Sequence, residues 1–196
     1  MIVAVILAAG LSRRMGQPKL LLLLEGRPVI RHAVERVIAG GVAEAIVVTA
    51  PERDALETAL AGLAVRFAVN PDPAAGQASS IAAGIAAVPA TTTAALIALG
   101  DQPALDRRII PALLETRRRT DRPVVAPRYR HELGTPVLFG AEVFPELLAL
   151  TGDRGARAVV EREPDRVAFV DFDLPMPQDV DTPAEYERLR TPGKPV

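Results

Sequence analysis

Two groups of charged side chains in this sequence are of the types that bind a polyphosphate together with a metal ion. The first group is basic and follows a loop of small residues that opens at Gly10. Backbone N–H groups of such a loop can approach phosphate oxygens closely, and Arg and Lys form short, charge-assisted hydrogen bonds to phosphate. An uncompensated cluster of Arg13, Arg14 and Lys19 beside this loop therefore favours a polyphosphate ligand.

Two common phosphate-binding loops are excluded by the spacing of the glycines. Gly10 and Gly16 are six positions apart and Gln17 follows. The loop therefore matches neither G-x-x-x-x-G-K-[ST] nor G-x-G-x-x-G. An ordinary strand-to-helix turn with solvated arginines is the alternative interpretation of this stretch.

The second group is acidic. Asp101 follows the apolar run 94–99 and Gly100, at the carboxyl end of an expected strand. Mg²⁺ takes one or two carboxylates and completes its shell with water and phosphate oxygens. Asp179 and Asp181 share a face if their backbone is extended, because side chains alternate with period two. Since Asp is also a common turn residue, Asp101 is a metal candidate only if it faces a polyphosphate loop.

A third stretch, 70–80, places polar groups near the same edge. It is rich in turn formers and leads through Gln77 to Ser79 and Ser80, at the start of an expected helix over 81–88. In open α/β sheets, ligands bind in the crevice at the carboxyl ends of the strands, where helix N-termini offer donors. Either serine could instead be a plain N-cap.

The elements that must position these residues alternate along the chain. Apolar runs predict strands at residues 2–7, 45–49, 65–69, 94–99, 123–126, 136–139 and 167–172. Helices are expected after Pro28, after Pro51, at 81–88, after a cap at Asp106, at 142–150, at 153–160 and, capped by Thr182, at 184–189. This alternation predicts an α/β fold with helices on both faces of a mostly parallel sheet. We expect one domain over residues 1–190 and a frayed tail at 191–196.

Composition excludes several classes of function. The net charge is −1, which gives no general attraction to nucleic acid or to an anionic membrane, and 4% aromatic residues leave few platforms for stacking bases. The absence of cysteine excludes disulfides, thiolate metal sites and a thiol nucleophile. No apolar run resembles a membrane span or a secretory leader. We therefore expect a cytoplasmic protein that binds small molecules.

Ordered motifs along nearly the whole chain resemble the nucleotidyltransferases of molybdenum cofactor maturation, and most closely the molybdenum cofactor cytidylyltransferases. These motifs are LAAGLSRRMGQPKLL at 7–21, NPDPAAGQASSIAAG at 70–84, LGDQP at 99–103, GTPVLFG at 134–140, LTGDRGAR at 150–157 and DVDTPAEY at 179–186. The first motif alone would indicate only the wider nucleotidyltransferase superfamily.

This resemblance implies a three-layer α/β/α nucleotidyltransferase fold of Rossmann-like type. It implies transfer of CMP from CTP to a molybdopterin-type cofactor with Mg²⁺, or Mn²⁺ in its place, and a recipient molybdoenzyme as a protein partner. The implied nucleotide-binding residues are Leu7, Ala8, Ala9, Gly10, Ser12, Arg14, Lys19, Gln77, Ser79 and Gly100. The implied metal ligand is Asp101, completed by Asp179 or Asp181, and the implied catalytic residues are Arg14, Lys19 and Asp101.

Two positions bear on specificity. Related guanylyltransferases carry glycine where Ala9 stands, so a methyl group here narrows the slot for the base and favours a pyrimidine, although one methyl group discriminates by only ~1–3 kcal/mol. Thr135 stands where the family commonly has histidine, which predicts a changed acceptor pocket. The alternatives are a guanylyltransferase or a sugar-phosphate nucleotidyltransferase on the same fold, and a non-enzymatic carrier or chaperone of the cofactor.

Overall fold

The computed structural model describes residues 1–12 and 14–190, so Arg13 and the tail expected to fray lie outside the described residues. The strands are β1 (Ile2–Leu7), β2 (Leu23–Leu24), β3 (Arg27–Pro28), β4 (Glu44–Thr49), β5 (Arg66–Val69), β6 (Ala94–Leu99), β7 (Val124–Tyr129), β8 (Glu132–Leu133), β9 (Val137–Gly140) and β10 (Val167–Phe172). The helices are α1 (Val29–Ala39), α2 (Asp54–Ala59), α3 (Gln77–Ala86), α4 (Ile109–Arg119), α5 (Phe144–Leu148), α6 (Arg157–Arg162) and α7 (Pro183–Arg190).

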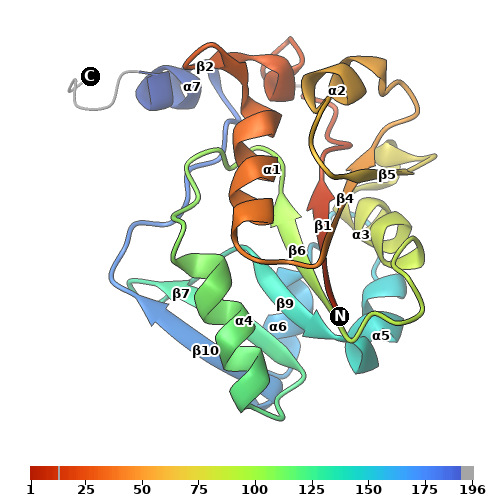
Figure 1. The fold of residues 1–196 in the computed structure, drawn as a ribbon, viewed down its shortest axis with the longest axis vertical. Helices are drawn as coiled ribbons and strands as arrows, with labels where there is room; N and C mark the ends of the chain where they lie inside the picture. Colours follow the sequence, from red (N-terminus) through yellow and green to blue (C-terminus); the bar gives the residue numbers. More distant parts are fainter. Residues whose placement is uncertain (13, 191–196) are drawn as a thin grey trace.

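One mixed sheet forms the centre of the molecule (Figure 1). Its strand order is β10-β7-β9-β6-β1-β4-β5, with β8 paired to β7. Strand β9 is antiparallel to both of its neighbours, whereas β1 is parallel to β4 and β6. Leu7 pairs with Val48 and with Leu99, so the carboxyl ends of β1, β4 and β6 meet at one edge of the sheet.

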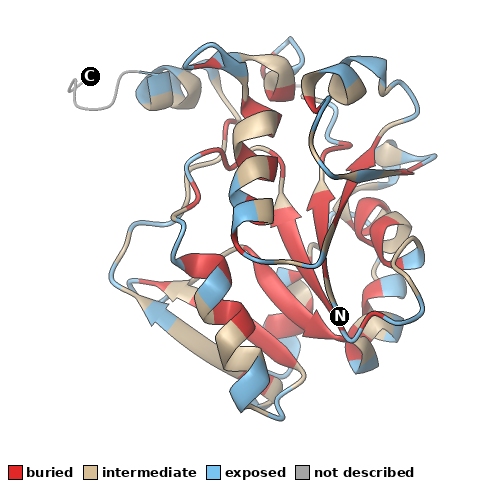
Figure 2. Ribbon diagram, viewed as in Figure 1, coloured by how far each residue is buried: buried red, intermediate tan, exposed pale blue. Residues whose placement is uncertain are grey.

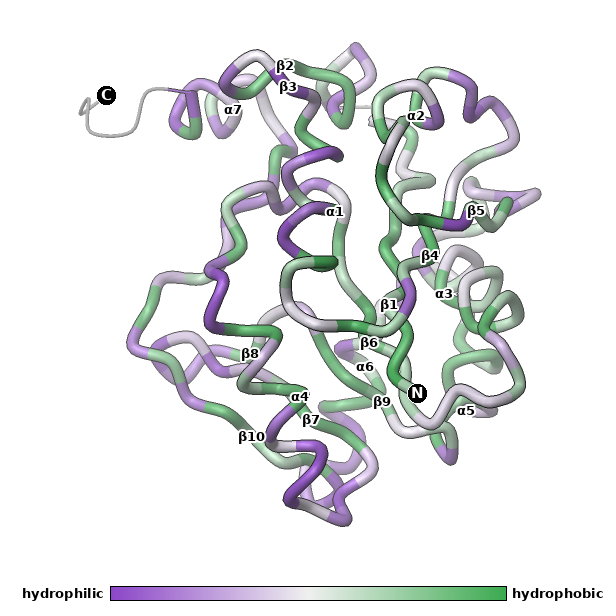
Figure 3. The backbone as a smooth tube through the Cα atoms, viewed as in Figure 1, coloured by the Kyte–Doolittle hydropathy of each residue, from purple (hydrophilic) through white to green (hydrophobic). Residues whose placement is uncertain are grey.

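Two hydrophobic cores lie on opposite faces of this sheet, because side chains alternate along β1. Ala4 and Ile6 contribute to the core formed with α1 and α4, and Val3 and Val5 to the core formed with α3, α5 and α6. The central strands are buried on both faces (Figure 2) and are hydrophobic along their length (Figure 3). Burying a Val or Ile side chain fully stabilises the fold by ~1.5–3 kcal/mol. The predicted three-layer α/β fold is confirmed.

The strands predicted at 2–7, 94–99 and 167–172 have these bounds in the structure. The strand predicted at 123–126 is too short, because β7 continues through Pro127 to Tyr129. Proline has no N–H to donate, but β9 pairs with β7 only at Val124 and Val125. No ladder hydrogen bond from Pro127 is therefore required on that side of the strand.

The helix predicted at 153–160 is wrong at its start. Helix α6 begins at Arg157, and the loop before it rests on the start of α3, where Gly152 O accepts a hydrogen bond from Ala78 N at 3.1 Å. The helix predicted at 142–150 is too long. Helix α5 covers only Phe144–Leu148, because a 3₁₀ turn at Ala141–Val143 precedes it.

Neither Ser79 nor Ser80 is the N-cap of α3, which begins at Gln77. The N-cap is Gly76, at φ +99, a conformation that L side chains rarely adopt. A Cβ atom on Gly76 would also lie 2.4 Å from the backbone of Gly152. Glycine is therefore required for the loop before α6 to approach α3.

The two other predicted caps have different outcomes. Asp106 does not cap α4; its Oδ1 accepts a hydrogen bond from Arg108 N at 2.9 Å in the turn before that helix. At α7, Thr182 Oγ1 accepts from Glu185 N at 3.3 Å and Glu185 Oε2 accepts from Thr182 N at 2.7 Å. This reciprocal pair is a capping box, so the predicted cap at Thr182 is confirmed.

Among the described residues, no helix has both the length and the apolar character needed to cross a bilayer.

Candidate active site

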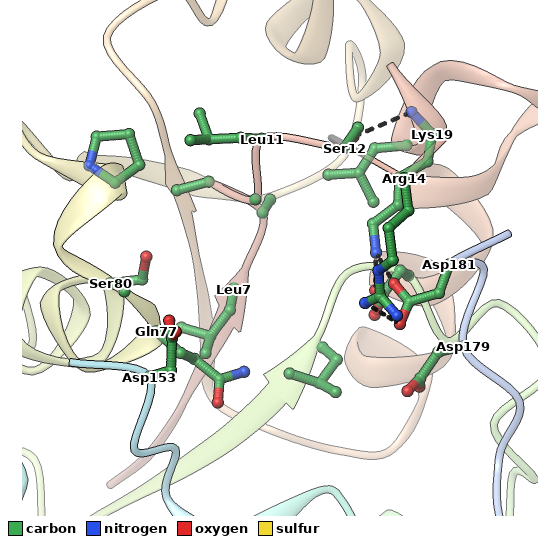
Figure 4. A pocket seen from close by; sticks show the side chains of 18 of the residues that line it. Leu7, Leu11, Ser12, Arg14, Lys19, Gln77, Ser80, Asp153, Asp179 and Asp181 are labelled. Atoms are coloured by element: carbon green, nitrogen blue, oxygen red, sulfur yellow. Dashed lines mark hydrogen bonds and ion pairs between the residues drawn. The ribbon is translucent and has the colours of Figure 1, made fainter. Parts of the chain in front are cut away.

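A cavity of about 500 Å³ opens at the edge of the sheet where β1 and β6 end (Figure 4). This first cavity is large enough for a nucleotide-sized ligand. Its two ends differ in chemistry. Arg14, Lys19 and three carboxylates line one end, and Gln77, Ser80 and Asp153 lie at the other.

The loop after β1 forms one wall. Ala8 N donates to Val48 O at 2.8 Å, which ties the start of the loop to the sheet. Ser12 Oγ accepts a hydrogen bond from Lys19 N at 3.3 Å, which holds the two ends of the loop together. A Cβ atom on Gly10 would meet no atom within 4 Å, so the backbone there is open to a ligand.

Lys19 and Arg14 form ion pairs with acidic residues that are distant in the sequence. Lys19 Nζ lies 2.5 Å from Asp101 Oδ2 and 2.6 Å from Asp181 Oδ1. Arg14 Nη2 lies 2.7 Å from Asp181 Oδ2. The expectation of an uncompensated basic cluster is therefore wrong for Arg14 and Lys19, and Arg13 lies outside the described residues. The acidic partners are 82 and 162 to 167 positions away, beyond the reach of local sequence patterns.

These contacts shift the pKa values at this end of the cavity. Burial disfavours the Lys19 ammonium, but the charge of Asp101 and the hydrogen bonds to both carboxylates outweigh it and raise the pKa of Lys19. Burial would likewise raise the pKa of Asp181, but Lys19 and Arg14 lower it. For Asp179, burial and the charge of Asp101 raise the pKa, against a hydrogen bond from Gln102.

The acidic pair fits a hard cation. Oxygens of Asp101 and Asp181 converge on one positively charged atom, Lys19 Nζ, so the two carboxylates lie close enough together to contact a single cation. Asp179 instead accepts a hydrogen bond from Gln102 at 2.8 Å. Among the described residues there is no cluster of three or more His, Cys, Asp or Glu able to hold a metal ion. Mg²⁺ commonly takes only one or two carboxylates beside water and phosphate oxygens.

The net charge of the first cavity also affects whether a triphosphate would need a metal ion to bind there. Its described wall carries four carboxylates, from Asp101, Asp153, Asp179 and Asp181, and only two cationic side chains, from Arg14 and Lys19. An anionic triphosphate that enters the first cavity would meet a wall of net negative charge. A divalent cation would offset that repulsion.

A second cavity of about 270 Å³ adjoins the first. The two share the wall formed by Leu7, Gln77, Leu99 and Asp179. The second cavity is lined largely by aliphatic side chains, with Gln102, Thr135 and Arg157 among its polar residues. Two ligands could therefore meet at the shared wall.

The structure brings most of the residues expected at the site to the first cavity. Its wall includes Leu7, Ala8, Ala9, Gly10, Ser12, Arg14, Lys19, Gln77, Asp101, Asp179 and Asp181. Ser79 and Gly100 do not line it. Ser79 Oγ lies within hydrogen-bond distance of the carbonyl oxygens of Asp72 and Gly76. A Cβ atom on Gly100 would lie 2.6 Å from Ile30 Cδ1, behind the wall.

Sequence reasoning missed two polar residues of the cavities. Asp153 lies in the loop that was expected to be helical, and glycines at 152 and 155 were the available signal. Gln102 directly follows Asp101, but nothing in the sequence showed that it is only 5% exposed and bonded to Asp179.

Comparisons with known proteins identify the family of the chain. Residues 4–167 match the family described as MobA-like NTP transferase domain. The chain is 34% identical to nicotine blue oxidoreductase of Paenarthrobacter nicotinovorans and 28% identical to the purine catabolism protein PucB of Bacillus subtilis, over 96% of each chain in both cases. It is also similar to the crystal structure of Rv0371c from Mycobacterium tuberculosis in complex with manganese, with a TM-score of 0.83, 29% identity and coverage of 96% of this chain and 97% of that one.

Proposed function

The chain belongs to the MobA-like NTP transferase family and is a nucleotidyltransferase, and we propose that it transfers CMP from CTP to a molybdopterin-type molybdenum cofactor with release of pyrophosphate. One observation carries this proposal. The converging carboxylates of Asp101 and Asp181 lie in a nucleotide-sized cavity that shares a wall with a second, more apolar cavity. We propose that the first cavity takes CTP and the second takes the acceptor.

The proposed nucleotide position follows the two ends of the first cavity. Backbone groups and side chains of 7–10 would hold the base and ribose, with Gln77 on the opposite wall. The methyl group of Ala9, 4% exposed, narrows the slot and favours a pyrimidine over a purine. Ser79 and Gly100 would support the wall from behind rather than contact the nucleotide.

The triphosphate would lie at the charged end. Arg14, Lys19 and the Ser12 hydroxyl would donate to its oxygens, with Asp101 and Asp181 as ligands of Mg²⁺. Mn²⁺ would bind in its place, since the similar Rv0371c structure is a manganese complex. When bound, the metal supplies positive charge against the negative charge of the phosphates.

The proposed reaction is an in-line displacement at the α-phosphorus of CTP. An oxygen of the acceptor phosphate forms a bond to that phosphorus, the bond to the bridging oxygen of the β-phosphate breaks, and pyrophosphate leaves with the electron pair. A phosphate monoester is already anionic near neutral pH, because its second pKa is about 6, so no general base is required. The role of Arg14 and Lys19 is to orient the phosphates and offset charge on the leaving group.

A second candidate function follows from one relative. The protein that is 34% identical over nearly the full length is named an oxidoreductase. A reductase on this fold would bind its substrate in the same cavities but would have no use for carboxylates that converge on a cation. The contact of Lys19 with both Asp101 and Asp181 therefore favours nucleotidyl transfer.

The test is pyrophosphate release from CTP, GTP and UTP with Mg²⁺, in the presence and absence of molybdopterin. We expect release with CTP only when the acceptor is present, and loss of turnover by at least about 100-fold in Asp101→Asn. Preference for GTP or UTP would favour a guanylyltransferase or a sugar-phosphate nucleotidyltransferase. Binding of the cofactor without pyrophosphate release would favour a carrier. Oxidation or reduction of nicotine blue by the protein would favour the oxidoreductase.

The proposal also covers organisation and location. We propose one nucleotidyltransferase domain over residues 1–190 that acts in the cytoplasm, with a recipient molybdoenzyme as its protein partner.

A further inference from the structure

A chain of three polar side chains connects the two cavities. Thr135 Oγ1 donates to Gln102 Oε1 at 2.8 Å, and Gln102 Nε2 donates to Asp179 Oδ1 at 2.8 Å. Thr135 and Gln102 line the second cavity, and Asp179 lies in the wall that both cavities share. Gln102 is only 5% exposed, so water has little access to replace either bond.

The chemistry of the partners fixes the orientation of the Gln102 amide. An ionised carboxylate only accepts hydrogen bonds, so the NH₂ group must face Asp179. The amide oxygen must then face a donor, and the Thr135 hydroxyl is that donor. The carboxylate of Asp179 therefore determines which end of the Gln102 amide faces it, and the hydrogen bond from Thr135 to the amide oxygen holds Gln102 in place against that carboxylate.

Both ends of this chain are anchored by the fold. Tyr129 OH donates to Thr135 O at 2.7 Å, and the Tyr129 ring stacks on Phe172 at a centroid distance of 6.0 Å. At the other end, Val180 N donates to Asp101 O at 3.1 Å, which ties the segment of Asp179 to the end of β6. The three side chains therefore lie between two rigid supports.

We propose that Gln102 and Thr135 are positioning residues, which hold the Asp179 carboxylate at the shared wall so that its second oxygen can accept a hydrogen bond from an N–H or O–H group of the acceptor. This inference rests on the proposed function, because it assigns the second cavity to the acceptor. It separates the acidic residues by role: Asp101 and Asp181 converge on a cation, whereas Asp179 is turned toward the acceptor by Gln102.

The kinetic test uses Thr135→Val, which keeps the shape of the side chain and removes the donor. We expect kcat/KM for the acceptor to fall about 10-fold, the equivalent of one buried hydrogen bond, with the KM for CTP unchanged within about twofold. Thr135→Ser keeps the hydroxyl and should restore the wild-type value. Gln102→Met, which breaks the chain from its centre, should reproduce the loss.

A matched control is Thr92→Val. The Thr92 hydroxyl is buried and has no hydrogen-bond partner among the described residues, and Thr92 lines neither cavity. The same chemical change at this position should leave both kinetic constants unchanged. Three results would overturn the proposal: wild-type kinetics in Thr135→Val, a rise of about 10-fold in the KM for CTP in that variant, or failure of Thr135→Ser to restore kcat/KM for the acceptor.

A second measurement does not depend on the reaction. In ¹⁵N-labelled protein the side-chain NH₂ resonances of Gln102 should shift in Thr135→Val and in Asp179→Asn and stay in place in Thr92→Val. If the wild type transfers no nucleotide, the proposed function fails, and these resonances still decide whether the chain of hydrogen bonds exists. If the Gln102 NH₂ resonances have the same chemical shifts in Thr135→Val and in Asp179→Asn as in the wild type, that result alone would overturn the inference.

Discussion

Lys19 and Asp101, 82 positions apart in the sequence, form an ion pair at 2.5 Å at the edge of the central sheet. Their side chains are only 12% and 17% exposed, so the pair is largely shielded from solvent. Because Asp181 also contacts the Lys19 ammonium, one lysine occupies the point on which both carboxylates converge. If these two carboxylates bind a metal ion as proposed, the metal must compete with Lys19 for the same oxygens, and we predict that its binding frees Lys19 to contact phosphate.

Removing this lysine should strengthen metal binding in the absence of nucleotide. We predict that Lys19→Met binds Mn²⁺ at least ~10-fold more tightly than the wild type, a difference of about 1.4 kcal/mol, because no ammonium has to be displaced. Nucleotidyl transfer in this variant should fall, because a phosphate contact is lost. Calorimetric titration with Mn²⁺ measures the affinity.

The control for this experiment is Arg128→Met. Arg128 pairs with Asp171 at 2.8 Å outside both cavities, so its loss also removes one positive charge from an ion pair. Its Mn²⁺ affinity should equal that of the wild type. Unchanged or weaker Mn²⁺ binding by Lys19→Met would show that Lys19 does not compete with the metal.

Asp181 should stabilise the metal-free protein in a pH-dependent way. Its pKa is lowered in the folded state, since Lys19 and Arg14 outweigh the effect of burial. A lowered carboxyl pKa stabilises the fold above the unfolded value of about 3.9, and this stabilisation is lost as the pH falls through the folded value. Asp181→Asn should therefore lower the free energy of unfolding at pH 7 by about 1–2 kcal/mol, and the deficit should shrink below pH 4. Urea unfolding at both pH values measures this; a deficit that grows in acid would be the wrong sign.

Gly84 should not tolerate a methyl group, although it lies inside a helix. Helix propensity alone favours Ala over Gly by about 1 kcal/mol. However, a Cβ atom on Gly84 would lie 2.2 Å from Val5 Cγ1 and 3.0 Å from Val48 Cγ2, where α3 packs on the sheet. We predict that Gly84→Ala lowers the free energy of unfolding by about 1–3 kcal/mol in urea unfolding. A gain in stability would mean that α3 packs less closely than described.

The protein should become more stable when Thr49 loses its hydroxyl group. Its side chain is fully buried at the end of β4, and its Oγ1 finds no hydrogen-bond partner among the described residues. Because an unsatisfied buried hydroxyl costs free energy, Thr49→Val should raise the free energy of unfolding by about 1 kcal/mol. Thermal unfolding followed by circular dichroism would detect the change, and a lower Tm would reveal a partner for this hydroxyl.

Much of the fold was predictable from the sequence because its signals are local. The apolar runs 2–7 and 94–99 specify strands buried on both faces, and each run places its following loop at the same edge of the sheet. This is why Gly10, Lys19 and Asp101 could be assigned to one site without coordinates. The capping box at Thr182 was predictable for the same reason, since its two residues are three positions apart.

The remaining features depend on contacts between distant segments. The start of α3 at Gln77 depends on the loop at Gly152, about 75 positions away along the sequence. The preference of serine for N-cap positions instead predicted a start at Ser79 or Ser80. The neutralisation of Lys19 by Asp181 likewise joins the first loop to the last one. Burial of Gln102 in the wall of the second cavity could be recognised only after the strands had been arranged.

The central claim is that the charged end of the first cavity binds a nucleoside triphosphate together with a divalent metal, and the affinity for CTP tests it most directly. Calorimetric titration of the wild type with CTP in Mg²⁺, repeated in excess EDTA, measures the role of the metal. We predict that the wild type binds CTP in Mg²⁺ and loses at least ~10-fold in affinity in EDTA, because the described wall carries more carboxylates than cations. We predict that Asp101→Asn binds CTP with this same weak affinity in either condition. Equal affinity for CTP with and without the metal, or no binding in Mg²⁺, would contradict it.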